Sequence, residues 1–182
     1  MARLPYPDPA TLPEETQRLL EQLPVKLNIF RMMANAPTNF RPLVTLGTAV
    51  LAQQKLPHKL RELAILRVAN LSSAKYEWVQ HVPIAEACGI TSAQIAAIER
   101  GALEADCFDD VERLVLRFTT ELVQDVRVSD MTFAEAKSRL SSQEVVELVI
   151  AVGYYMLIAR LLETTDVDLD EPKGAGIFKA LR

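Results

Sequence analysis

Hydrophobic residues recur at helical rather than alternating spacing along most of the chain. No run of β-branched residues alternates with polar residues between turn signals, as a strand would require. Residues 91–94, 132–135 and 141–144 each begin with a hydroxyl side chain that Glu or Gln follows three positions later, the capping-box pattern of a helix start. Gly89 and Gly101 stand where helices should end, because glycine adopts the left-handed C-terminal conformation at little cost. The pattern predicts an all-α fold.

Two of the predicted helices are apolar around their whole circumference. They are PHKLRELAILRVANLSS, residues 57–73, and LVIAVGYYMLIARLL, residues 148–162. A helix of this kind is buried on every side, within the domain or between subunits. Glu62, Arg67 and Asn70 should therefore lie in or beside the core, where unpaired polar groups are costly. We expect part of one such helix to be covered by a second copy of the chain.

The spacing of prolines separates a short N-terminal segment from the rest. Four of the first 13 residues are proline, which predicts an extended arm over residues 1–13. Residues 14–182 show no linker and no internal repeat, and their length suits one domain with a substantial core. We therefore expect one all-α domain that follows a proline-rich arm.

Composition narrows the class of protein. Hydrophobic residues make up 49% and charged residues 24%, a balance typical of soluble globular proteins. The net charge of −4 and the lack of a basic stripe argue against a nucleic-acid partner. The N-terminus has no apolar leader, and the uninterrupted apolar run 148–159 is shorter than the ~20 residues of a membrane span. Two cysteines cannot form a disulfide framework, so we expect a reduced, cytoplasmic protein without a membrane partner.

The stretch SAKYEWVQH, residues 73–81, collects chemistry-bearing side chains. It contains the only tryptophan, Trp78, together with Tyr76, and Glu77 stands one helical turn before His81. A carboxylate within reach of an imidazole selects its tautomer and favours its charged form, as a general acid requires. On a helix, one face carries Glu77 and His81 together with Ala74, Ala85 and Cys88.

The same stretch also allows a purely structural interpretation. A Glu–His pair four residues apart is an ordinary helix-surface interaction worth about 0.3 kcal/mol. Tyr76 and Trp78 could equally be packing residues. Pro83 cannot donate to the carbonyl of Val79, so the helix should kink or restart just beyond His81.

Four stretches carry a family resemblance. They are LNIFRMMANAP, LRELAILRVANL, YEWVQHVPIAEACGIT and VELVIAVGYYMLIARLL, in this order between residues 27 and 162. This segment resembles the carboxymuconolactone decarboxylase family, which includes the alkylhydroperoxidase D-like proteins. The resemblance implies an all-helical fold that assembles into a homo-oligomer, a dimer, trimer or hexamer.

The peroxidase branch of that family carries Glu, eleven residues, Cys-x-x-Cys, three residues and His. On this chain the four positions are Glu62, Ala74, Glu77 and His81, so the outer residues match and both sulfurs are absent. Peroxide reduction needs a thiolate and a second thiol that resolves it. Cys88, two turns beyond His81, could act alone, although a small buried apolar role is the alternative. The acidic neighbours of the other cysteine, Cys107, disfavour a thiolate.

The decarboxylating branch works without the cysteine pair and without a cofactor. By this resemblance the chain is a cofactor-free lyase-type acid–base enzyme on a small lactone-like or carboxylated metabolite. His81 would donate or shuttle the proton, Glu62 would orient it or act as the base, and Glu77 would tune its charge. The YEWxxH pattern matches neither branch fully. Additional candidates for the substrate pocket are Tyr76, Trp78, Arg67 and Cys88, with Arg67 or Arg61 as partner of a substrate anion.

Three alternatives to the lyase-type enzyme stay open. A thiol peroxidase would use Cys88 alone. A non-catalytic oligomeric scaffold or small-molecule binding protein would have Glu62 and His81 far apart or the site filled by side chains. A metal held by Glu62, Glu77 and His81 is conceivable by ligand type. With only two histidines in the chain we expect no metal.

Overall fold

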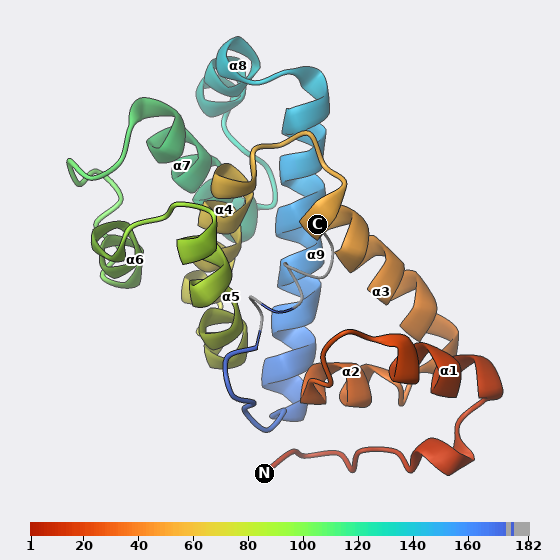
Figure 1. The fold of residues 1–182 in the computed structure, drawn as a ribbon. Helices are drawn as coiled ribbons and strands as arrows, with labels where there is room; N and C mark the ends of the chain where they lie inside the picture. Colours follow the sequence, from red (N-terminus) through yellow and green to blue (C-terminus); the bar gives the residue numbers. More distant parts are fainter. Residues whose placement is uncertain (174–175, 177–182) are drawn as a thin grey trace.

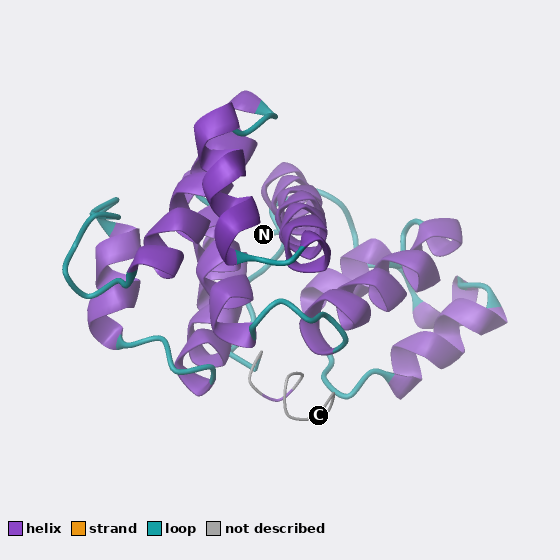
Figure 2. Cartoon of the chain, turned by 90° about the horizontal axis from the view of Figure 1, so that it is seen from above, coloured by secondary structure: helices purple, strands orange, loops and turns teal. Residues whose placement is uncertain are grey.

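The computed structural model describes residues 1–173 and residue 176, and every regular element in this part is a helix (Figures 1 and 2). The predicted all-α fold is confirmed. After a short 3₁₀ helix at Pro9–Thr11, the helices are α1 Glu14–Gln22, α2 Asn28–Met33, α3 Pro37–Ala52, α4 His58–Leu71, α5 Lys75–Ala87, α6 Ser92–Glu99, α7 Asp110–Asp125, α8 Asp130–Arg139 and α9 Ser142–Thr165.

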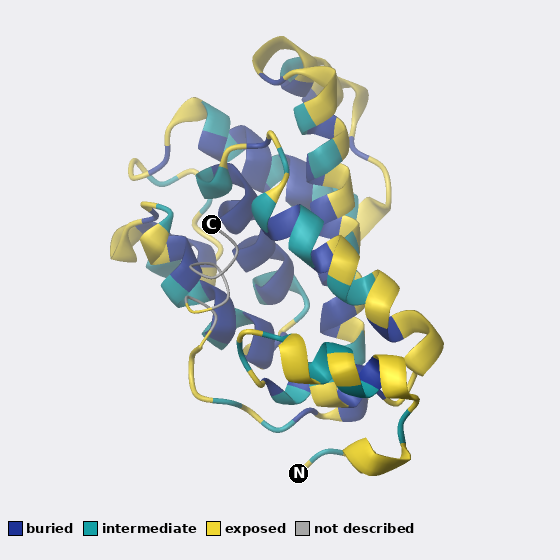
Figure 3. Cartoon of the chain, turned by 45° about the vertical axis from the view of Figure 1, so that its right-hand side comes forward, coloured by how far each residue is buried: buried dark blue, intermediate teal, exposed yellow. Residues whose placement is uncertain are grey.

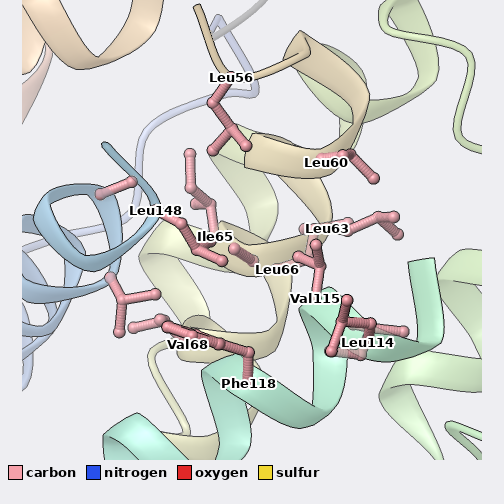
Figure 4. Packing of buried hydrophobic residues seen from close by; sticks show 14 of the residues in the cluster. Leu56, Leu60, Leu63, Ile65, Leu66, Val68, Leu114, Val115, Phe118 and Leu148 are labelled. Carbon is pink, nitrogen blue, oxygen red and sulfur yellow. The ribbon is translucent and has the colours of Figure 1, made fainter. Parts of the chain in front are cut away.

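Helix α4 lies at the centre of the fold and packs against α5, α7 and α9. Its ten consecutive residues from Leu60 to Ala69 are all buried. Leucine, isoleucine and valine side chains of α4 meet apolar side chains of α7 and α9 around it (Figure 4). Figure 3 shows the same buried centre surrounded by exposed outer helices. Burial on every side explains why this segment lacks an amphipathic stripe and encloses the charged Arg61 and Glu62.

The helix ends follow the predicted signals, with one correction. Capping boxes form at 91–94 and 141–144, and Gly89 and Gly101 have φ of 87° and 72°. The predicted box at 132–135 is wrong, because α8 begins earlier, at Asp130. Ser129 caps α8 by accepting from the Thr132 backbone N–H at 3.2 Å. The Thr132 hydroxyl instead donates to Glu121 Oε1 at 2.7 Å.

Sequence reasoning missed one helix start, and of the two outcomes expected beyond His81, a kink or a restart, the restart is wrong. Asp109 and Glu112 form a capping box at the start of α7. Helix α5 runs through Pro83 as one element and does not restart beyond His81. Pro83 removes one backbone donor from the interior of α5 without ending the helix.

The N-terminal arm lies against the end of α9 of its own chain. The Arg3 backbone N–H donates to the Thr165 carbonyl at 2.8 Å. The Tyr6 hydroxyl donates to Asp168 Oδ2 at 3.1 Å. Within the described residues, α9 alone is long and apolar enough to cross a membrane by length and composition, and 44% of its most apolar window is buried in the fold. A core helix has the same properties.

A second apolar cluster lies where α2, α3, α5 and α9 converge. It contains Phe40 of α3, Tyr76 of α5 and Ile158 of α9, and the residues of α2 complete it. This convergence places the chemistry-bearing side of α5 against an apolar wall.

Candidate functional site

His81 and Glu62 meet although 19 positions separate them in the chain. His81 Nδ1 lies 2.9 Å from Glu62 Oε2, which joins α5 to the central helix α4. The Glu62 side chain is fully buried, and that of His81 is 10% exposed. Because Nδ1 faces the carboxylate, the other ring nitrogen, Nε2, is the one left for chemistry.

Arg61 lies on the other side of the Glu62 carboxylate. Its Nε and Nη2 donate to Glu62 Oε1 at 3.1 and 3.0 Å, and both side chains are fully buried. Its Nη1 lies 2.6 Å from His58 Nδ1. The two oxygens of Glu62 thus face different partners, an arginine and a histidine. The guanidinium balances the carboxylate, which costs several kcal/mol to bury alone.

Glu77 lies on the same side of α5 as His81 but has different surroundings. It is 2% exposed, and neither of its carboxyl oxygens has a hydrogen-bond partner among the described residues. Burial raises the pKa of Glu77 well above its ordinary value, and the nearby charges of Glu163 and Glu62 raise it further. Its place in the first turn of α5 favours the anion by only about 1 kcal/mol. Desolvation is the larger effect, so the uncharged carboxyl is favoured.

Glu77 and His81 both line a cavity of about 120 Å³. Its other walls are mainly apolar side chains from α2, α3, α5 and α9, for example Ile29, Val44, Ile84 and Ile158. No lysine or arginine lines it within the described part of the chain. The cavity thus combines an apolar wall with one imidazole and one carboxyl, an arrangement typical of small-molecule sites.

Two tyrosines of α9 shape the cavity beside these groups. Tyr155 packs edge-to-face on His81, with ring centroids 4.8 Å apart, and holds the imidazole plane in place. Tyr154 donates its hydroxyl to the Leu43 carbonyl at 3.1 Å. Burial raises the pKa of Tyr154 to about 12 and that of Tyr155 well above its ordinary value, so both stay neutral hydroxyls.

The segment that follows α9 holds two residues of the cavity wall through hydrogen bonds. Asp170 Oδ2 accepts from the Asn28 backbone N–H at 2.6 Å and from the Tyr76 hydroxyl. The Gln80 side chain donates to the Asp170 and Glu171 carbonyls at 3.2 and 3.0 Å. Tyr76 and Gln80 line the cavity and are held by this segment.

Four of the seven predicted site residues are brought to the same place. Glu77, His81 and Tyr76 line the cavity, and Glu62 lies directly behind His81. Glu77 is no surface charge, and the helix-surface interpretation of the Glu77–His81 pair does not describe this buried arrangement. The catalytic roles assigned to these residues stay predictions.

The other three predicted residues do not line the cavity. Arg67 Nε donates to Thr120 Oγ1 at 2.9 Å and Nη1 to Asn70 Oδ1 at 2.7 Å, which turns this side chain toward α7. Trp78 packs against the main core cluster. Cys88 is the C-cap residue of α5, and Cys107 is exposed between α6 and α7. Successive residues of a helix point in different directions. These three side chains therefore point toward other neighbouring elements than the cavity-lining side chains do.

Arg61 also has a different partner from the one predicted. It was a candidate for holding a substrate anion, but its guanidinium faces Glu62, and it does not line the cavity. Within the described residues, no group of three or more His, Cys, Asp or Glu side chains could hold a metal ion.

Comparison with known proteins finds a family model that covers part of this site. The model of the Carboxymuconolactone decarboxylase family matches residues 37–121, from α3 into α7, and this range contains both Glu62 and His81. Over these residues the chain is similar to this family. Its two cysteines, Cys88 and Cys107, form no Cys-x-x-Cys pair. No curated protein matches the chain in sequence.

Several solved structures share the fold. An uncharacterized peroxidase-related protein from Ralstonia eutropha JMP134, described as an alkylhydroperoxidase AhpD core, is 18% identical with a TM-score of 0.81, over 97% of this chain and 96% of that chain. An uncharacterized peroxidase-related protein from Silicibacter sp. TM1040 is 16% identical with a TM-score of 0.78, over 93% and 92%. The debrominase Bmp8, in complex with 2,3,4-tribromopyrrole, is 15% identical with a TM-score of 0.71, over 93% and 90%. These likenesses establish an alkylhydroperoxidase D-like fold.

Sequence reasoning missed Tyr154 and Tyr155 as parts of the site. Their signal was present, since two adjacent tyrosines in an otherwise apolar helix need polar partners when they are buried. Gly47 of α3 was also missed. A side-chain carbon at Gly47 would collide with the Tyr154 hydroxyl, and this contact is invisible without the packing of α3 on α9.

Proposed function

We propose that this protein is a cofactor-free acid–base enzyme of the lyase or decarboxylase type that acts on a small lactone-like or carboxylated molecule. The observation that carries this proposal is the contact between His81 Nδ1 and Glu62 Oε2 at the wall of the cavity. A histidine backed by a buried carboxylate and exposed to a small apolar cavity is an arrangement suited to general acid–base catalysis.

In this proposal His81 moves a proton between its Nε2 and a substrate carbon beside a carbonyl group. When the proton leaves the carbon, the electron pair stays on the substrate as an enolate, and the imidazole becomes an imidazolium. Glu62 stabilises that imidazolium through Nδ1 and fixes its orientation. In a decarboxylation the bond to the carboxylate breaks, CO₂ leaves, the electron pair stays on the carbon and His81 supplies the proton. Water then returns a proton to His81.

Thiol peroxidase activity has less support. The relatives described as peroxidase-related share the fold. Cys88 does not line the cavity that His81 and Glu77 share, and Cys107 is exposed. A peroxide bound near His81 would therefore meet no thiolate from a described cavity residue.

A proton-exchange assay tests the proposal without the natural substrate. δ-Valerolactone is incubated with the protein in D₂O, and NMR follows deuterium at the carbon beside the carbonyl. We expect exchange faster than in buffer, reduced by about 10²–10⁴ in His81→Ala and retained in Cys88→Ser. Decarboxylation of a lactone acid and reduction of an organic hydroperoxide are measured in parallel on the same variants.

The assays separate the candidate functions. Exchange or decarboxylation that is lost with His81 supports the acid–base enzyme. Hydroperoxide turnover that is lost with Cys88 would contradict it and make the protein a single-cysteine peroxidase. No turnover in any assay would favour a non-catalytic binding protein.

A further inference from the structure

We propose that Glu77 is the recognition group of the cavity, and that its ligand is a small uncharged molecule with a carbonyl of the lactone, ketone or amide type that pairs with the Glu77 carboxyl. This inference deepens the proposed function and rests on it, because it names the substrate class of the same cavity. Of the lactone-like and carboxylated classes, it selects the uncharged one.

The Glu77 carboxyl is built into the wall without a partner of its own. Both of its oxygens are buried and make no hydrogen bond within the described residues. Buried polar groups in proteins are nearly always paired, and an unpaired one at a cavity is satisfied by what enters the cavity. An uncharged carboxyl offers one donor and one acceptor, which complement a carbonyl group, and most fully an amide.

The charges around the cavity disfavour an anionic ligand. Lysine and arginine are absent from its described lining. The guanidinium of Arg61 faces Glu62, and Glu163 and Glu62 are the charged groups that act on Glu77. His81 is the one lining side chain described that can carry positive charge, and Glu62 already lies against it. A carboxylate in the cavity would thus be desolvated beside acidic groups without a cation of its own.

The size and walls of the cavity set the rest of the ligand. A volume of about 120 Å³ is close to that of an engineered apolar cavity of about 150 Å³ that binds benzene. Apolar side chains of α2, α3 and α9 surround that space, among them Phe30, Leu51 and Ile158. The ligand is therefore one small ring or a chain of similar size, with its single polar group toward Glu77.

Three probes that each carry one substituent on a benzene ring test this inference by binding alone. Benzamide carries an uncharged carbonyl, benzoate has nearly the same shape with a negative charge, and toluene has no polar group. Calorimetric titration of wild type at neutral pH should give an affinity for benzamide at least about tenfold above that for benzoate. Glu77→Gln keeps a donor and an acceptor and should retain benzamide affinity within about threefold.

The variant Glu77→Leu isolates the role of the carboxyl. The ratio of benzamide to toluene affinity should fall by about tenfold or more relative to wild type, because the apolar ring contacts stay and the polar partner is lost. Circular dichroism and thermal unfolding confirm that each variant is folded. An equal or tighter affinity for benzoate, an unchanged ratio in Glu77→Leu, or no binding of any probe to wild type would overturn the inference.

Failure of the proposed function is measured separately. His81→Gln should lose proton exchange but keep benzamide affinity within about threefold, because the polar group of the ligand faces Glu77. Wild type that prefers benzamide over benzoate but exchanges no proton would contradict the proposed enzyme while it supports the recognition role of Glu77.

Discussion

Two carboxyl groups, Glu62 and Glu77, lie in the same part of the fold with opposite surroundings. Arg61 forms an ion pair with Glu62, and the other oxygen of Glu62 contacts His81 Nδ1. Glu77 has an apolar cavity on one side and no described hydrogen-bond partner. Such a pair of environments separates the roles of two identical chemical groups, one paired with an arginine and a histidine and one as an uncharged donor.

At this scale the pH dependence of stability reports on Glu77. Burial raises its pKa in the folded chain above the ordinary value of 4.5, so above that pH the unfolded chain loses this proton first. Below about pH 4.5, the ordinary pKa, this group does not lower the free energy of unfolding. Above it, the free energy of unfolding falls by about 1.4 kcal/mol per pH unit until the pH reaches the folded-state pKa of Glu77. Glu77→Gln removes this loss. We expect its free energy of unfolding to exceed that of wild type by more at about pH 7 than at about pH 5.

Urea denaturation at the two pH values measures this difference. Glu86→Gln, at an exposed position of the same helix, is the matched control and should follow wild type at both. A gain for Glu77→Gln that is the same at both pH values would contradict an uncharged Glu77.

The close contact of α3 with α9 shapes the cavity at the scale of elements. Gly47 leaves room for the Tyr154 side chain, whose hydroxyl donates to Leu43 of the same α3. Both helices contribute to the cavity wall, α3 through Gly47 and α9 through Tyr154. The position of Tyr154 thus depends on a glycine over 100 residues away in the chain.

The same substitution at two helical glycines should have opposite effects. Gly47→Ala forces Tyr154 to move and should lower the free energy of unfolding by about 1–3 kcal/mol, as overpacked cores do. Gly153→Ala, in α9, meets no heavy atom of its own chain within 4 Å, and in the monomer it should raise the free energy of unfolding by about 0.5–1 kcal/mol through helix propensity. Thermal and urea unfolding measure both. A Gly47→Ala variant at least as stable as wild type would show that Tyr154 yields without cost.

Helix α9 carries an exposed apolar face at the scale of the whole molecule. Val146, Val149, Ile150 and Leu157 recur at helical spacing and are 57%, 41%, 41% and 45% exposed. The buried side of the same helix faces α4. Packing against α4 therefore explains the apolar residues on the buried side of α9, but not those on its exposed side.

We expect this face to be covered by a second copy of the chain, as the family resemblance implies. Ile150→Asp should then lower the mass measured by sedimentation, because a charge in an apolar interface is costly. Val126→Asp, at an exposed apolar residue beyond α7, is the control and should leave the mass unchanged. A wild-type chain that sediments as a monomer at micromolar concentration would contradict the predicted homo-oligomer.

The sequence by itself determined the fold class, and the family resemblance predicted the contact at the centre of the site. Helical spacing, helix-end residues and the all-round apolar α4 were sufficient for an all-α prediction, because these signals are local. The spacing of Glu62 and His81 indicated their pairing through the family resemblance. Burial of α4 followed from its pattern, since a helix that is apolar on every side has to be enclosed.

Only the tertiary structure decided which side chains face the cavity. Glu77, Trp78 and Cys88 share one helix, yet only Glu77 reaches the cavity. A helical pattern gives the angle between two side chains but not which neighbouring element covers each face. That choice depends on helices α2, α3 and α9, which are distant in sequence and close the cavity by packing against α5. The burial of Glu77, which carries the inferred substrate class, follows from that packing.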